Sequence, residues 1–385
     1  MNRKKESLAP VDTNVSRTDK GDGEFEFLNL HEIVKRARDR LDQNNWDYIV
    51  GGTETETTLR RNRMALDSIA FRPRVLRDVR NVDASAECLG RKMRLPVILA
   101  PIGALESFDE GAGATVARAA DAFGVAHMLS SVSEPGLEHV ARAAPGAFRI
   151  YQLYVRGDDS FVDDHVARAI AHGYAAFCLT VDTAIYSRRE RDLAKRFVTS
   201  GRRRVSATDG SGFQAGLDWR AVERIKGKFD VPLILKGIAT AEDTKIACEY
   251  GVDWVYASNH GGRQLDHGRG ALDLLPEIVR ASAGRAKIVV DGGISRGTDI
   301  VKAIATGADL VGIGRLQCYA LAAAGQPGVL RMLELLEDEV QRCLGLLGVN
   351  RFADLDATYL LPATPANPPG VLSAFPLLDI EDYRY

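Results

Sequence analysis

Eight short apolar runs recur along the chain, and a stretch with helical character follows each of them. The runs lie at residues 97–103, 126–131, 148–154, 175–182, 232–238, 254–261, 287–293 and 309–315. They are rich in Val, Ile and Leu and are apolar throughout rather than at alternate positions, which is typical of parallel strands buried on both faces. Strands that alternate with helices form right-handed crossover units, and eight such units close into an α/β barrel of the (β/α)8, or TIM, type.

Helical patterns are also found outside the strand repeats. Residues 28–41 and 56–69 carry apolar side chains at helical spacing, and we expect these two helices to cap the bottom of the barrel or its flank. Near the other end of the barrel, a helix is predicted from Ser295 or Thr298 to Gly307, because it starts at a capping residue and ends at a glycine.

We predict one barrel domain over residues 25–360, N-terminal helices included. The chain has 385 residues, and such barrels commonly reach about 250 residues before extensions are added. Residues 1–24 are polar and are expected to form a disordered tail. Residues 361–385 are too proline-rich at their start for a helix, and we expect an extended tail that wraps a neighbouring subunit. Within the long connection 183–231, a lid over the barrel mouth is expected around residues 199–216.

Composition narrows the class of protein. The net charge is −2 with acidic and basic residues interspersed, so no overall field attracts nucleic acid or an anionic membrane, and the basic cluster at 201–204 is interpreted as a solvated loop. The five cysteines are far apart and include no CxxC, which argues against a metal site or a disulfide framework. No apolar stretch reaches the ~18 residues of a membrane helix. We therefore expect a cytoplasmic protein without a metal ion.

Polar residues or glycines stand at the carboxyl end of nearly every predicted strand. In a barrel of this type the chemistry is located at that end of the strands. One such residue would be an ordinary cap or turn, but together they predict a lined pocket. The set comprises Gly103, Ser130, Gln152 with Tyr154, Thr180 with Asp182, Lys236, Ser258 with His260, Asp291 with Gly293, and Gly314 with Arg315.

The last two strands end in glycine-rich loops that are suited to phosphate. Glycines let backbone N–H groups approach an anion, a following helix N-terminus adds partial positive charge, and Arg296 and Arg315 are able to fork onto phosphate oxygens. Lys236 follows the apolar residues of its strand, where it would stabilise the negative charge of a reduced flavin, so the phosphorylated ligand is predicted to be FMN. The alternative for Lys236 is a salt bridge with Asp182 or Asp291.

The sequence Asn-His-Gly-Gly-Arg at 259–263 closes the sixth predicted strand. His260 is suited to moving a proton near neutral pH, Asp182 to orienting it, and Arg263 to binding a carboxylate in a bidentate manner. This trio favours a 2-hydroxy acid as the substrate. The alternative is a structural histidine at a strand end.

At these residues the chain resembles the FMN-dependent α-hydroxy acid oxidase and dehydrogenase family, of the glycolate oxidase, lactate oxidase and mandelate dehydrogenase type. The resemblance extends from Leu30 to Gly348. The matching stretches are DYIVGG (47–52), FRPRVLRDV (71–79), LAPIG (99–103), YQLY (151–154), LTVDT (179–183), RRERDLAKRF (188–197), LKGI (235–238), SNHGGRQLD (258–266) and DGGISRGTDIVKAIATGAD (291–309).

The resemblance implies the reaction and a role for each residue. A 2-hydroxy acid would give up two electrons from its α-carbon to become a 2-oxo acid, with reduced flavin as the other product, in an enzyme that is expected to be a homotetramer. His260 would be the base, Asp182 its partner, and Tyr154 a contact of the substrate hydroxyl. The implied carboxylate ligands are Tyr48, Arg189 and Arg263. The implied FMN ligands are Gly103, Ser130, Gln152, Thr180, Lys236 and Ser258 around the ring, Asp291 on the ribityl chain, and Gly293, Arg296, Gly314 and Arg315 on the phosphate.

Departures from the family pattern bear on the substrate and on the acceptor. Val132 stands where glycolate oxidases carry tryptophan, and Tyr186 where they carry leucine, so we expect a larger or aromatic substrate side chain to be admitted. Gly103, expected near flavin N5, favours an acceptor other than oxygen. Two alternatives stay open at this point, namely another FMN-barrel enzyme, such as an isomerase or dehydrogenase with the same phosphate site, and a barrel without catalytic activity.

Overall fold

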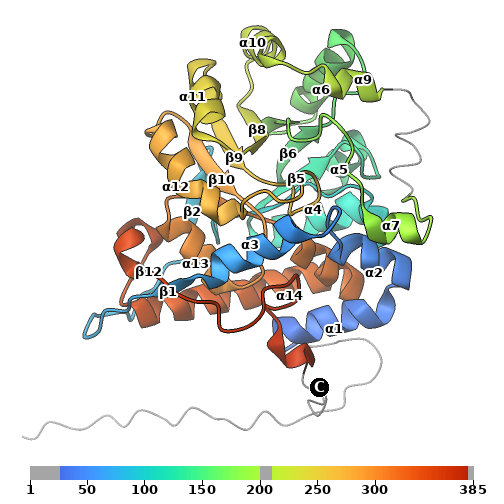
Figure 1. Ribbon diagram of the computed structural model, residues 1–385. Coiled ribbons are helices and arrows are strands. Elements are labelled where there is room, and N and C mark those ends of the chain that lie inside the picture. The colour runs from blue at the N-terminus through green and yellow to red at the C-terminus, as the bar shows by residue number, and fades with distance from the viewer. Residues whose placement is uncertain (1–26, 200–209, 380–385) are drawn as a thin grey trace, which may run out of the picture.

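The barrel strands close on themselves. The structure, a computed structural model, describes residues 27–199 and 210–379. Its closed sheet has the order β10-β11-β4-β5-β6-β7-β8-β9, and every neighbouring pair is parallel. Figure 1 shows this barrel with helices around it. The strands are β4 (Val97–Leu99), β5 (Ala126–Ser130), β6 (Phe148–Leu153), β7 (Ala176–Thr180), β8 (Leu233–Ile238), β9 (Trp254–Ala257), β10 (Lys287–Val290) and β11 (Leu310–Ile313). Each predicted run contains one of them, so the predicted barrel is confirmed.

Helices surround the strands and explain why the runs are apolar on both faces. One set of strand side chains, which includes Met128, Ile150 and Val289, fills the barrel interior, while their chain neighbours pack outward against the helices. The surrounding helices are α4 (Ala112–Phe123), α5 (Leu137–Ala143), α6 (Asp159–Ala171), α10 (Trp219–Lys228), α11 (Ala241–Glu249), α12 (Ala271–Ser282), α13 (Gly297–Ala305) and α14 (Arg315–Leu347). α13 begins at Gly297, between the two predicted starts.

Tyr256 and Gly312 face each other in the barrel interior and pack without space between them. Tyr256 of β9 is fully buried, and its ring lies 5.3 Å from the Nζ atom of Lys236. Gly312 of β11 faces it, and a Cβ atom at position 312 would overlap the hydroxyl oxygen of Tyr256. Only glycine therefore fits opposite this tyrosine.

The N-terminal helices are placed differently from the prediction. α1 (Leu30–Arg40) does lie on the flank, along α14, but α2 (Gln43–Val50) and α3 (Thr57–Asp67) contribute to the barrel mouth. The helix predicted at 56–69 corresponds to α3, and the prediction that it caps the bottom or the flank was wrong, because polar contacts with the loop after β9 hold α3 at the mouth. α2 was not predicted from the sequence. The backbone N–H of Thr58 donates to Asp266 at 2.8 Å, and Asn62 and Asn259 exchange amide hydrogen bonds.

The bottom of the barrel is covered instead by the hairpin of β2 (Ala86–Cys88) and β3 (Arg91–Met93), whose Cys88 and Met93 join the interior cluster. Between β7 and β8 the structure describes α7 (Glu190–Ala194) and α9 (Ser211–Ala215). Residues 200–209 of the expected lid, which include the basic cluster, lie outside the described residues, as does the expected N-terminal tail.

The C-terminal tail folds back on its own chain. β12 (Leu360–Pro362) pairs antiparallel with β1 (Ile69–Phe71), and a 3-10 helix follows at Pro376–Asp379. Phe375 is 0% exposed and meets the His31 ring edge-on at 5.7 Å. The described part of the tail is thus held by its own chain, and the expectation that it wraps a neighbouring subunit stays a prediction. In the described ranges, no helix is long and apolar enough to cross a membrane.

Candidate active site

The carboxyl ends of the barrel strands surround a cavity of about 270 Å³. Most of the predicted site residues line it, namely Tyr48, Gly103, Tyr154, Arg189, Lys236, His260, Arg263, Asp291, Gly293, Gly314 and Arg315. Ser130, Gln152, Thr180, Asp182 and Ser258 are not among the lining residues and lie at the same strand ends or just beyond them. Arg296 is likewise absent from the lining. The barrel therefore brings together side chains spread over more than 260 positions of the sequence, from 48 to 315.

His260 is held in a defined orientation by a partner on each ring nitrogen. Its Nδ1 atom lies 3.0 Å from Oδ1 and 3.2 Å from Oδ2 of Asp182, and its Nε2 atom lies 3.1 Å from the hydroxyl of Tyr154. A carboxylate accepts a hydrogen bond from Nδ1–H, so the neutral ring presents Nε2 as the acceptor. The imidazole is 16% exposed and the Asp182 carboxylate 12%.

The electrostatics keep His260 neutral near pH 7. Burial lowers the pKa of His260, and Lys236 acts in the same direction, while Asp182 opposes both without restoring the usual value. The pKa of Asp182 is itself lowered, because His260 and Lys236 outweigh the effect of its burial. The pair is therefore an ionised carboxylate behind a neutral imidazole, which is the state that a general base requires.

Backbone conformation and close packing explain why two glycines follow His260. Gly261 and Gly262 have φ values of 64° and 76°, and a Cβ atom on Gly262 would lie 2.5 Å from the backbone nitrogen of Leu59. The loop after β9 is thus pressed against α3, and only glycine allows that approach. This contact brings Arg263 back toward the cavity.

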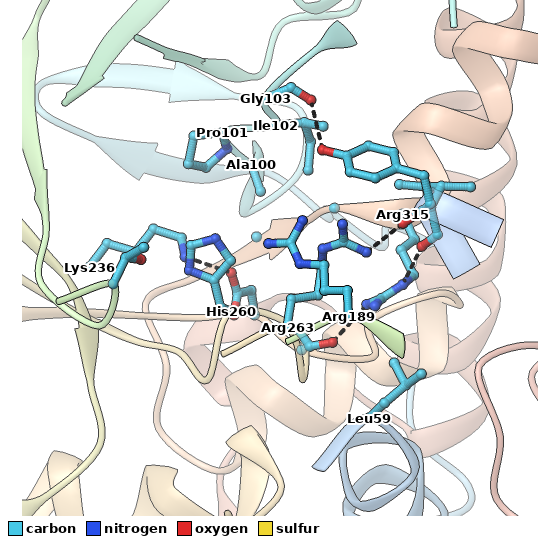
Figure 2. A pocket seen from close by; sticks show the side chains of 18 of the residues that line it. Leu59, Ala100, Pro101, Ile102, Gly103, Arg189, Lys236, His260, Arg263 and Arg315 are labelled. Atoms are coloured by element: carbon cyan, nitrogen blue, oxygen red, sulfur yellow. Dashed lines mark hydrogen bonds and ion pairs between the residues drawn. The ribbon is translucent and has the colours of Figure 1, made fainter. Parts of the chain in front are cut away.

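Arg263 and Arg189 form a cationic wall beside His260, as Figure 2 shows. Nη1 of Arg263 donates to the carbonyls of Tyr48 at 2.5 Å and Gly51 at 3.0 Å, and its guanidinium lies 4.7 Å from the Tyr48 ring centre. Nη2 of Arg263 and Nε of Arg189 are buried and have no hydrogen-bond partner in the described part of the chain. Burial and the neighbouring Arg189 lower the pKa of Arg263. A carboxylate would satisfy both donors and relieve this repulsion.

Lys236 lies near the carboxyl end of β8, at the floor of the cavity, and is 3% exposed. Its Nζ atom donates to Ser258 at 3.1 Å and lies 3.8 Å from Asp291. Burial alone would lower the pKa of Lys236, but Asp291 and Asp182 together raise it. The salt bridge considered from the sequence therefore exists, and it keeps a charged ammonium next to the cavity.

The buried side-chain amide of Gln152 indicates whether a flavin ring suits this site. Nε2 of Gln152 donates to the hydroxyl of Thr180 at 2.9 Å, whereas its Oε1 atom is buried and accepts no hydrogen bond from any described residue. An orphan acceptor of this kind costs roughly 1–3 kcal/mol unless a ligand supplies a donor. The ring N–H of an isoalloxazine is such a donor, so the residues present fit the cofactor.

The two glycine-rich loops differ from each other. At α13, the backbone N–H groups of Ser295 and Arg296 donate to Asp299, and that of Gly297 donates to Glu339. The guanidinium of Arg296 pairs with the same Glu339. The prediction that Arg296 and the start of α13 hold the phosphate is therefore not supported, because carboxylates of this chain already occupy these donors.

The start of α14 is open by comparison. Its N-cap residue, Gly314, lines the cavity and makes no side-chain cap. Arg315 follows, and its Nε, Nη1 and Nη2 atoms donate to the carbonyls of Ile49, Gly261 and Gly51. Each terminal nitrogen keeps a second N–H for a ligand. Burial and Arg263 lower the pKa of Arg315 to about 10, so it stays charged at pH 7.

Other lining residues were not found from the sequence. Gln214 of α9 donates to the carbonyl of Thr180 at 2.9 Å and accepts from the N–H of Val155 at 2.7 Å, so it joins the ends of β6 and β7. Gly370 and Val371 reach the cavity from the C-terminal tail. No local pattern marks these positions, because their partners are distant in the sequence.

Comparisons with known proteins agree with this geometry. A family model described as FMN-dependent dehydrogenase matches residues 37–362. The chain is 36% identical over 369 residues to glycolate oxidase 3 of Arabidopsis thaliana, covering 91% of this chain and 100% of the relative. It is 38% identical over 357 residues to L-lactate oxidase of a Nostoc species, covering 86% and 98%. A solved structure of a mandelate oxidase mutant with a C4a-OH-FMN adduct superposes with a TM-score of 0.78 at 36% identity, covering 86% of this chain and 98% of that one.

The chain therefore belongs to the FMN-dependent dehydrogenase family. Its cofactor is FMN, and it is an enzyme that oxidises 2-hydroxy acids. The two alternatives left open by the sequence, another type of FMN-barrel enzyme and a barrel without catalytic activity, are thereby set aside. Glycolate, lactate and mandelate enzymes match at nearly equal identity, so the comparisons do not select the substrate.

Proposed function

We propose that this enzyme oxidises a 2-hydroxy acid with a bulky or aromatic side chain to the 2-oxo acid. The observation that carries the proposal is the small size of one cavity wall. Gly103 and Val132 both line the cavity and pack directly on each other, since a Cβ atom at position 103 would lie 2.7 Å from Cγ2 of Val132. Where glycolate oxidases carry an indole, this wall has only two methyl groups, which leaves room for a substrate side chain.

The carboxylate of the substrate is proposed to bind Arg263 and Arg189. The buried and unpartnered Nη2 of Arg263 and Nε of Arg189 support this role in the described part of the site. Tyr48 is the third proposed ligand, and its hydroxyl donates to the carbonyl of Gly103 at 3.4 Å. A bound carboxylate would thus lie against the Tyr48 hydroxyl as well as the two guanidinium groups.

His260 is proposed as the base. Its Nε2 lone pair accepts the proton that leaves the substrate, and Asp182 stabilises the imidazolium that results. Tyr154 shares this nitrogen and is proposed to contact the substrate hydroxyl. Removal of the α-proton or of the hydroxyl proton makes the same demand on His260, since both require a neutral nitrogen at the substrate.

When bound, FMN takes up the two electrons that leave the α-carbon. Lys236 is proposed to face the ring edge that gains negative charge, with Asp291 toward the ribityl chain. The remaining proposed ring ligands are Gly103, Ser130, Gln152, Thr180 and Ser258, and the proposed phosphate ligands are Gly293, Gly314 and Arg315. Arg296 leaves this set because it pairs with Glu339.

A single experiment tests substrate and acceptor together. The FMN-loaded enzyme is mixed anaerobically with glycolate, lactate or mandelate, the loss of absorbance near 450 nm is followed, and air is then admitted. We expect fastest reduction by mandelate. Slow return of colour in air would favour an acceptor other than oxygen. A clear preference for glycolate would contradict the proposed side chain, and no reduction by any 2-hydroxy acid would contradict the proposed site.

We also propose a homotetramer in the cytoplasm. Both properties come from the family resemblance and from the composition of the chain. Sedimentation of the purified enzyme and fractionation of the source cells test them separately.

A further inference from the structure

We propose that the C-terminal segment, defined as residues 370–375, forms part of the FMN site and closes its phosphate end. The proposal rests on FMN lying in the cavity with its phosphate near the loops after β10 and β11. It goes beyond the ligands proposed above, none of which belongs to the C-terminal tail.

The C-terminal segment reaches the cavity at one particular place. Gly370 and Val371 line the same cavity as Gly293, Ile294 and Ser295. The carbonyl of Ala374 accepts a hydrogen bond from Nη1 of Arg296 at 3.4 Å, which places the segment along the loop after β10. Val371 therefore lies at the end of the cavity where that loop exposes its glycines.

Several contacts hold the segment in place. Phe375 is fully buried and packs on His31, which anchors one end of the segment to α1. Ser373 accepts a hydrogen bond from the N–H of Gly370 at 3.0 Å and donates to its carbonyl at 2.8 Å, so the segment forms a closed turn. Arg296, which the sequence assigned to the phosphate, instead joins this turn to Glu339. A side chain expected to hold the ligand thus holds the segment that covers it.

The chemistry of the segment suits an anion behind it. Its sequence, Gly-Val-Leu-Ser-Ala-Phe, contains no carboxylate that would repel a phosphate. An apolar cover excludes water, and charge–dipole attraction between a phosphate and the N–H groups of the loops is stronger where the local dielectric constant is lower. The segment is therefore expected to slow the loss of FMN.

The sharpest test places a charge at Val371. Apoenzyme of Val371→Asp, Val371→Asn and wild type is titrated with FMN and with riboflavin, which lacks the phosphate, and the dissociation constants are read from flavin fluorescence. A carboxylate close to a phosphate should weaken FMN binding by at least about tenfold. Val371→Asn should have a smaller effect, and the two variants should bind riboflavin equally well. Asn367→Ala, at an exposed position of the same tail, is the matched control.

A second variant tests the anchor. Phe375→Ala should accelerate the release of FMN from the holoenzyme, whereas Phe123→Ala, which removes an equally buried ring from α4, should lower the melting temperature without changing that rate. Equal FMN affinity in Val371→Asp and wild type, or an equal loss of FMN and riboflavin affinity, would overturn the proposal. An enzyme that binds FMN and is reduced by a 2-hydroxy acid, yet gives one of these results, would refute only this inference and leave the proposed function intact.

Discussion

The two ends of the cavity are built in different ways. At the substrate end, His260 and Asp182 come together as predicted, because each closely follows a barrel strand whose register fixes its position. Arg263 is brought to them by the turn that Gly262 makes against α3. At the phosphate end, Arg296 turns away toward Glu339, and a segment from the C-terminal tail takes part in the wall. The His260–Asp182 pair depends on the repeating architecture of the barrel, whereas the phosphate end depends on contacts between distant parts of the chain. Substitutions at the two ends should therefore have different effects on turnover and on FMN affinity.

Replacing His260 by glutamine should lower kcat by about 10³-fold, because general-base catalysis contributes roughly 10²–10⁴-fold. The affinity for FMN should stay near that of wild type if the two ends are independent. Single-turnover reduction and FMN titration measure the two quantities. His267→Gln is the control, since that imidazole is exposed further along the same loop. Loss of FMN binding in His260→Gln would break the comparison.

Replacing Asp182 by asparagine should lower kcat/KM by about 10²-fold and also move its pH dependence. His260 is active when neutral, so kcat/KM should fall as the pH drops below its pKa, which burial lowers from the usual value. Asp182 raises that pKa, and its loss should lower the pKa further. The acid limb of the kcat/KM profile should therefore move to lower pH. Movement to higher pH would contradict the assigned electrostatics.

Replacing Val132 by tryptophan should shift the ratio of kcat/KM for glycolate to that for mandelate by about tenfold in favour of glycolate, since size discrimination in an apolar pocket reaches roughly 10–200-fold. Val132→Ile, which adds one methylene group, should give a smaller shift in the same direction. An unchanged ratio in Val132→Trp would show that this wall does not contact the substrate side chain.

Replacing Arg296 by glutamine should have the smallest effect. The pair with Glu339 is partly exposed, at 27% and 22%, so its loss should lower the free energy of unfolding by about 0.2–1 kcal/mol. If Arg296 bound the phosphate directly, its replacement would instead cause a large loss of FMN affinity. FMN affinity within about threefold of wild type is expected, since a weakened hold on Ala374 costs less than a lost charge-assisted hydrogen bond. A loss of FMN affinity of about a hundredfold or more would show that Arg296 binds the phosphate after all.

The sequence predicts most of the barrel and of the substrate end because both follow from local patterns. An apolar run identifies a strand, and a polar residue near or just beyond its carboxyl end is brought to the mouth by the barrel itself, as with Lys236 and His260. Arg296 shows where this reasoning fails. A glycine and an arginine before a helix look the same in the sequence whether the N–H donors at the helix start are free or already bonded to a carboxylate. Glu339, which binds Arg296 and the start of α13, lies 43 positions after Arg296 in the chain.

The sequence did not predict where the helix at 56–69 and the C-terminal tail pack, for a related reason. Their apolar faces indicate burial but do not indicate which surface buries them. The contact of Gly262 with Leu59 and that of Phe375 with His31 fix those surfaces, and neither contact has a periodic signature.

The fit of Tyr256 against Gly312 has a consequence for redesign of the enzyme. The two positions behave as one unit, because adding even a methyl group at 312 requires the phenol at 256 to shrink in the same step. A library that varies the two sites independently would consist mostly of variants with steric overlap, whereas a coupled exchange moves bulk from β9 to β11 at constant volume. Such an exchange offers a way to alter the packing beneath Lys236 while leaving His260, Arg263 and Arg189 unchanged.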